Sequence, residues 1–135
     1  MLVIDASVAL AWCFADEASE TADRALDRVE HEGAVAPAIW PLEVANGLRS
    51  AERRGRLDLA DVGRLRALLA ALPVEVQNAD LEAALGGVLE LARTLNLSAH
   101  DAAYLALAAE RGLPLATADD RLRKACVEAG VALVG

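Results

Sequence analysis

Short apolar runs alternate with amphipathic segments along the whole chain, and this alternation constrains the fold more than any other feature. The apolar runs, which we predict to be strands, lie at residues 2–4, 34–36, 74–76, 113–116 and 131–134. Apolar residues between them recur at helical spacing, which predicts helices at about 7–14, 18–32, 39–55, 58–72, 79–94, 98–112 and 117–129. Strands that alternate with helices predict an α/β fold, in which a mostly parallel five-stranded sheet is covered by helices on both faces.

The length and composition fit one domain that spans residues 1–135. Hydrophobic residues make up 56% of the chain, which excludes disorder as its main state. Aromatic residues are only 3%, so the core must be aliphatic and rich in alanine. Cys13 and Cys126 match no metal-ligand spacing and fit free thiols in the core of a reduced protein.

The net charge of −8 disfavours an ordinary nucleic-acid-binding domain, which would be basic. No apolar run approaches the roughly 20 residues of a membrane-spanning helix. The first residues lack the basic region of a secretory signal. We therefore expect a cytoplasmic protein with no membrane contact.

Acidic residues follow the predicted strands or open the predicted helices. Asp5 ends the first strand, Glu43 lies in the first turn of a helix, and Asp101 follows Ser98 in an S-x-x-D capping pattern. Each has a purely structural explanation, because Asp5 could cap the next helix, Glu43 could interact with the helix dipole, and Asp101 could complete a capping box.

The fourth acidic position is doubled at Asp119 and Asp120, directly after the predicted strand at 113–116. Thr117 and Asp120 have the T-x-x-D spacing of a helix cap. We therefore predict that Asp120 caps the last helix, which leaves Asp119 without a structural role and makes it the candidate site residue.

The four acids Asp5, Glu43, Asp101 and Asp119 should meet at one edge of the sheet. The carboxyl ends of parallel strands and the helix starts that follow them share that edge. Four carboxylates there would repel one another strongly unless a cation is present. Oxygen-only ligands select Mg²⁺, or Mn²⁺, over zinc. His100 is expected to be a surface residue rather than a ligand.

Four motifs, in this order along the chain, resemble those of the PIN domain family and specifically its VapC-type toxins. They lie at residues 3–9, 41–46, 97–108 and 115–122, the last with the family's T-x-D-x-x-L pattern. The resemblance implies a PIN-like three-layer sandwich. It also implies a Mg²⁺-dependent endoribonuclease that acts as the toxin of a VapBC-type toxin–antitoxin pair. Its partners would be an RNA substrate, a cognate antitoxin that inhibits it, and a second copy in a homodimer.

The reaction that the resemblance implies is hydrolysis of an RNA phosphodiester by a metal-bound water, and it gives each acid a role. Asp5 and Asp101 are expected to be direct metal ligands. Glu43 and Asp119 are expected to act through water, by orienting or deprotonating the attacking molecule. Thr117 is expected to fix the local loop.

Two further features have an open interpretation. Asn46 shares a helix face with Glu43 and is expected to hydrogen-bond a ligand or phosphate. Four arginines end the same helix, and they either complement the helix dipole in solvent or contact the RNA backbone. They are Arg49, Arg53, Arg54 and Arg56.

Three alternatives compete with the nuclease. A phosphoacceptor receiver domain would need a pair of acids after the first strand, and here Ala6 and Ser7 follow Asp5. A haloacid-dehalogenase-like phosphatase would need an aspartate at the position of Ser7. The third alternative is a catalytically idle binding module whose acids only cap helices.

Overall fold

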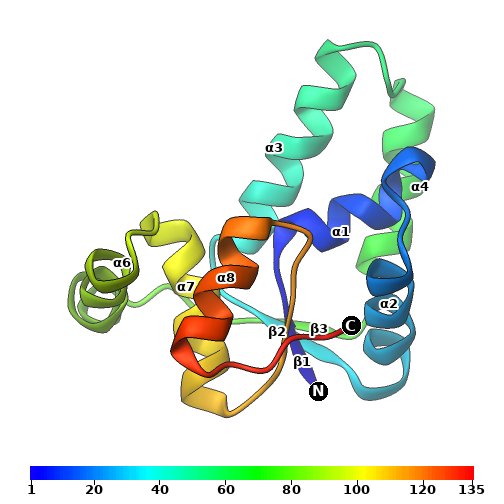
Figure 1. Ribbon diagram of the computed structural model, residues 1–135. Coiled ribbons are helices and arrows are strands. Elements are labelled where there is room, and N and C mark those ends of the chain that lie inside the picture. The colour runs from blue at the N-terminus through cyan, green and yellow to red at the C-terminus, as the bar shows by residue number, and fades with distance from the viewer.

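A parallel sheet of four strands lies at the centre of the computed structural model, which describes residues 1–135 (Figure 1). The strands are β1 (Leu2–Ile4), β2 (Ala34–Ala36), β3 (Val74–Val76) and β4 (Leu115–Ala116). Their order is β3-β2-β1-β4, and every neighbouring pair is parallel. Val3 in β1 lies opposite Val35 on one side and Leu115 on the other. The predicted parallel α/β architecture is confirmed.

The prediction of a fifth strand at 131–134 is wrong. This segment meets β4 only through a single bridge between Leu115 and Leu133, with the Leu115 amide donating to the Ala132 carbonyl at 2.9 Å. β4 itself is two residues long, because Pro114 before it has no amide hydrogen and Thr117 after it turns its hydroxyl toward β1. A strand this short offers too few backbone groups for a second regular ladder.

The helices cover both faces of the sheet, as the sequence predicts. They are α1 (Ala6–Cys13), α2 (Glu20–Glu32), α3 (Trp40–Arg53), α4 (Leu59–Ala70), α5 (Leu81–Ala83), α6 (Leu89–Leu95), α7 (Ala99–Arg111) and α8 (Asp120–Ala129). Two single turns complete the set, the 3₁₀ turn η1 (Ala15–Glu17) and the π turn η2 (Ala84–Val88). Figure 1 shows α2 and α4 on one side of the sheet and α6, α7 and α8 on the other.

The order of the strands places a topological switch point between β1 and β4. The chain moves outward from β1 to β2 and β3, and then returns to pair β4 on the other side of β1. Ligands of open α/β sheets bind at such a point, beyond the carboxyl ends of the strands. Asp5 directly follows β1 and Thr117 directly follows β4, so both lie at this point.

The core is aliphatic, in agreement with the composition. All three residues of β1 are fully buried, and Tyr104 of α7 is the largest side chain that is fully buried. Cys126 is a buried free thiol and Cys13 is half-buried. None of the helices is both long enough and apolar enough to cross a membrane.

The predicted helix at 79–94 contains an irregular turn. α5, η2 and α6 follow one another without a break, and the π turn coincides with Gly86 and Gly87. Glycine lowers helix stability because its backbone is the most flexible, so the wider turn forms where the helix is weakest.

Candidate active site

Asp5 is a buried carboxylate at the carboxyl end of β1, with only 4% of its surface exposed. It caps α1 by accepting a hydrogen bond from the Val8 amide at 2.9 Å. The Ser7 hydroxyl donates to the same carboxylate and lies 2.8 Å from each oxygen. Burial raises the pKa of Asp5 to about 6, although these hydrogen bonds lower it in part. Asp5 therefore caps α1 and is also the buried carboxylate at the predicted site.

Two hydroxyls join the ends of β1 and β4 around Asp5. The fully buried Thr117 donates its hydroxyl hydrogen to the Asp5 carboxylate, and its oxygen accepts from the Asp119 amide at 3.0 Å. The Ser7 hydroxyl oxygen accepts from the Ala118 amide at 2.9 Å. This network fixes the turn after β4 against the turn after β1, which brings the Asp119 region to the edge where Asp5 lies.

Glu43 lies in the first turn of α3 and is held by a residue that the sequence analysis did not select. The Tyr104 hydroxyl donates to one Glu43 carboxylate oxygen, and His100 Nδ1 lies 3.5 Å from the other. Burial and the charge of Glu43 raise the pKa of Tyr104, which keeps its phenol a donor. Tyr104 is three residues after Asp101 and so shares a helix face with it, a spacing that could have predicted this contact.

Trp40 is a second residue that the sequence analysis did not place at the site. Its indole nitrogen donates to the backbone carbonyl of Asp5 at 3.1 Å, and its ring is buried against the core. Residues 35 positions apart make this contact, so local sequence gave no signal for it.

Asp101 lies in the first turn of α7, where Ser98 caps the helix by accepting from the Asp101 amide at 3.1 Å. Its side chain is half-buried. Burial raises its pKa, and the negative charges of Asp119 and Glu43 raise it further, while the charge of Arg121 lowers it. The charge of Asp119 also raises the pKa of Asp5. Asp119 therefore acts electrostatically on both Asp5 and Asp101, and Glu43 acts on Asp101.

The prediction that Asp120 caps the last helix is wrong, because Asp119 does so. α8 begins at Asp120, and the Asp119 side chain accepts from the amides of Arg121 at 2.8 Å and Leu122 at 3.4 Å. The T-x-x-D pattern fails because the Thr117 hydroxyl points to Asp5 and caps no helix. Asp120 is exposed and makes no side-chain hydrogen bond.

The other predicted site residues lie apart from this network. Asn46 is exposed and makes no side-chain hydrogen bond. Arg49, Arg53 and Arg54 are exposed and form no ion pair, on a helix that leads away from the sheet edge in Figure 1. Arg56 pairs with Asp16 of η1 at 2.7 Å, so it joins the turn after α3 to η1.

The donor set fits a hard divalent cation held in part by water. No three acidic, histidine or cysteine side chains form a ready-made metal cage. Asp5, Glu43 and Asp119 each accept hydrogen bonds from protein donors. Mg²⁺ commonly keeps several waters and takes only one or two carboxylates. The oxygen-only donors and the mutual repulsion of these acids suit such an ion.

The sequence as a whole matches known proteins. Residues 2–128 match the PIN domain model. The chain belongs to the PIN domain family. It is also 37% identical over 122 residues to VapC ribonuclease Mb0985 of Mycobacterium bovis and to ribonuclease VapC9 of Mycobacterium tuberculosis. Each match covers 90% of this chain and 88% of the relative. The predicted resemblance to VapC-type PIN toxins is confirmed.

A solved structure has a similar fold. The crystal structure of PAE2754 from Pyrobaculum aerophilum superposes on this chain with a TM-score of 0.69 and 26% sequence identity. The match covers 92% of this chain and 84% of PAE2754. The four-stranded sheet of this PIN domain, with Asp5 at its switch point, therefore belongs to a known architecture.

Proposed function

We propose that this PIN domain is a Mg²⁺-dependent endoribonuclease that hydrolyses RNA phosphodiester bonds as the toxin of a VapBC-type pair. The observation that carries the proposal is the buried Asp5 carboxylate at the switch point, beside Asp101 and Asp119. Burying a carboxylate near other acids is costly. A divalent cation offsets that cost, so the arrangement fits a metal site better than a set of helix caps.

Each residue of the proposed site would have a separate task in the reaction. Asp5 and Asp101 would hold the cation, either Mg²⁺ or Mn²⁺. When bound, a divalent cation lowers the pKa of water and neutralises charge on phosphate oxygens. Glu43 and Asp119 would orient the attacking water and accept its proton. Tyr104 holds Glu43, and Thr117 holds Asp5, in fixed orientations for these tasks.

The proposed partners rest on the sequence similarity of this chain to the VapC ribonucleases. We propose a cognate antitoxin that inhibits the nuclease, a homodimer as the active form, and action in the cytoplasm. The net charge of −8 is consistent with a nuclease whose acidic site recruits cations before it meets RNA.

The test is cleavage of total cellular RNA by the antitoxin-free protein with Mg²⁺, with Mn²⁺ or with EDTA. We expect cleavage only with the metals. Asp5→Asn should lower the rate by about 10²-fold or more, because it removes a charged group at the reacting centre. Asp120→Asn is the matched control, since it removes an exposed acid one residue from Asp119 and should keep full activity.

Other outcomes would contradict the proposal. Cleavage that persists in EDTA or in Asp5→Asn would exclude the carboxylate site. Absence of both cleavage and metal binding, in a protein with an intact circular-dichroism spectrum, would favour the idle binding module whose acids only cap helices.

A further inference from the structure

A cleft of about 260 Å³ shares a wall with the candidate active site. Val8 and Thr117 line it, and both donate hydrogen bonds to the Asp5 carboxylate. The opposite wall comes from the start of α2, with Ser19 and Thr21, and Arg123 of α8 completes the lining. The cleft therefore lies behind Val8 and Thr117, two of the residues that hold Asp5, on the α2 side of the sheet.

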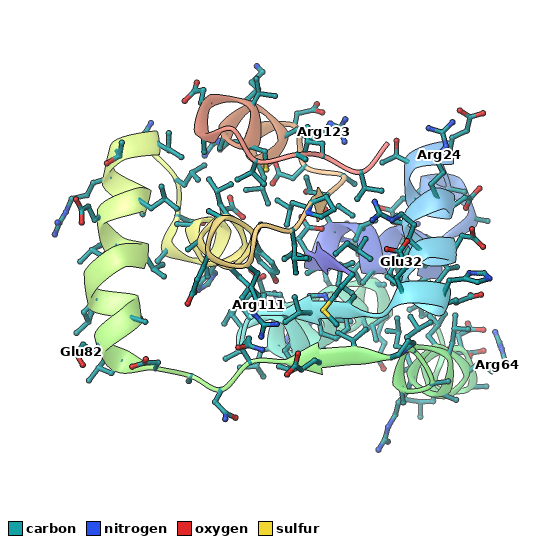
Figure 2. The ribbon with its side chains drawn as sticks, turned by 90° about the horizontal axis from the view of Figure 1, so that it is seen from below. Arg24, Glu32, Arg64, Glu82, Arg111 and Arg123 are labelled. Atoms are coloured by element: carbon teal, nitrogen blue, oxygen red, sulfur yellow. The ribbon has the colours of Figure 1, made fainter.

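Arg123 is the cation of this cleft, and it lacks an acidic partner. Its guanidinium makes one hydrogen bond, to the Thr117 carbonyl at 3.3 Å, and no ion pair. It is nevertheless half-buried. Arg24 pairs with Glu20 and Arg111 with Glu75, whereas Arg49, Arg53 and Arg54 also lack an ion pair but are exposed. Figure 2 shows Arg123 between α8 and α2.

The chemistry of this position points to a phosphate. A guanidinium has five donors in a planar fork that matches phosphate oxygens, and here four of them have no protein acceptor. Partial burial strengthens its attraction for an anion, because water screens the charge less. Arg121, the neighbouring cation, already acts on Asp101. The acid Glu17 at the cleft lies 3.8 Å from Arg56, which offsets part of its charge.

We propose that this cleft binds the nucleotide next to the scissile phosphate, with its phosphate on Arg123 and its sugar and base against the apolar wall. That wall is made by Val8, Ala22 and Ala118. The volume is below the roughly 300–1,000 Å³ of sites for drug-sized ligands, so it suits one unstacked nucleotide. Single-stranded RNA presents nucleotides in this way, whereas a duplex does not. The inference rests on the proposed function.

The test compares Arg123→Ala with Lys124→Ala. Lys124 is on the same helix and exposed, and it does not line the cleft, so its removal controls for the lost charge. The probe is a mixed-sequence single-stranded RNA 12-mer. Its affinity is measured in EDTA between 50 and 200 mM KCl, and its cleavage is measured with Mg²⁺. Arg123→Ala should lower kcat/KM about tenfold through KM. It should also reduce the slope of log affinity against log salt by about 0.7, the share of one phosphate contact.

Arg123→Lys tests how far the contact with RNA depends on charge alone. It keeps the charge, so the salt slope should stay close to that of the wild type. Equal behaviour of Arg123→Ala and Lys124→Ala would overturn the inference. A loss in kcat alone, with an unchanged salt slope, would overturn it as well, because that result assigns Arg123 to holding the Thr117 loop. If the wild type neither binds nor cleaves RNA, the proposed function itself fails, and this result is distinct from the other two.

Discussion

At the scale of single residues, Asp5 combines burial with four hydrogen-bond contacts from three donor residues. Val8, Ser7 and Thr117 hold its carboxylate, yet burial outweighs them, so its pKa is about 6 against an ordinary value of 3.8. The folded protein therefore binds a proton at Asp5 more tightly than the unfolded chain does. This difference makes the stability of the protein depend on pH.

We expect Asp5 to stabilise the fold fully below about pH 4, and this contribution to be lost as pH rises through about 6. The rise in the pKa of Asp5 from 3.8 to about 6 corresponds to about 3 kcal/mol of unfolding free energy. Asp5→Asn has no titrating group at this position. Between pH 4 and 7 the wild type should therefore lose stability relative to the variant. Chemical denaturation in EDTA at constant ionic strength measures it. If the wild type instead gains stability relative to the variant over this range, the fold stabilises the charged form of the carboxylate.

At the scale of elements, the start of α8 places a helix cap and a proposed site role on one side chain, Asp119. Asp119 accepts from two amides of the first turn of α8, and its charge acts on Asp5 and Asp101. An asparagine would keep the cap and remove the charge, because Asn and Asp cap helices about equally well.

Substitutions at Asp119 should therefore separate the two roles. Asp119→Ala should cost about 0.5–2 kcal/mol of unfolding free energy, and Asp119→Asn should cost little. Both should lose RNA cleavage. Asp120→Ala, at an exposed position, should change neither. Urea denaturation and the cleavage assay together check these outcomes, and a stable, active Asp119→Ala would remove Asp119 from both roles.

At the scale of the whole molecule, the charge of −8 and the acidic edge predict a metal-dependent stability. A cation that binds only the folded state stabilises it by mass action, by about 2.7 kcal/mol at a concentration of 100 times its Kd. We expect Mg²⁺ or Mn²⁺ to raise the melting temperature at pH 7.5 and to have little effect at pH 5, where Asp5 is largely protonated.

Thermal unfolding with matched ionic strength checks this prediction, because salt alone also screens the repulsion of a highly charged protein. KCl supplies the control for screening, and Asp5→Asn supplies the control for the site. An equal rise in the variant would show that the cation acts on the surface charge and not at Asp5.

The sequence by itself determined the order of the elements, the aliphatic core and the acids at the ends of strands and starts of helices. These features depend on local periodicity and on turn residues, which a single chain displays directly. The π turn at Gly86 and Gly87 and the Ser98 cap belong to the same class, because their causes lie within a few residues.

Only the tertiary structure decided which side chains hold the acids. Thr117 bonds Asp5 across 112 positions and Tyr104 bonds Glu43 across 61, so no local pattern specifies either contact. Thr117 lies at both places where the prediction was wrong, the short strand β4 and the cap of α8. β4 ends directly before Thr117, whose hydroxyl bonds Asp5, and Asp119 caps α8. A hydroxyl makes few hydrogen bonds, and a buried carboxylate competes for it more strongly than a helix end does.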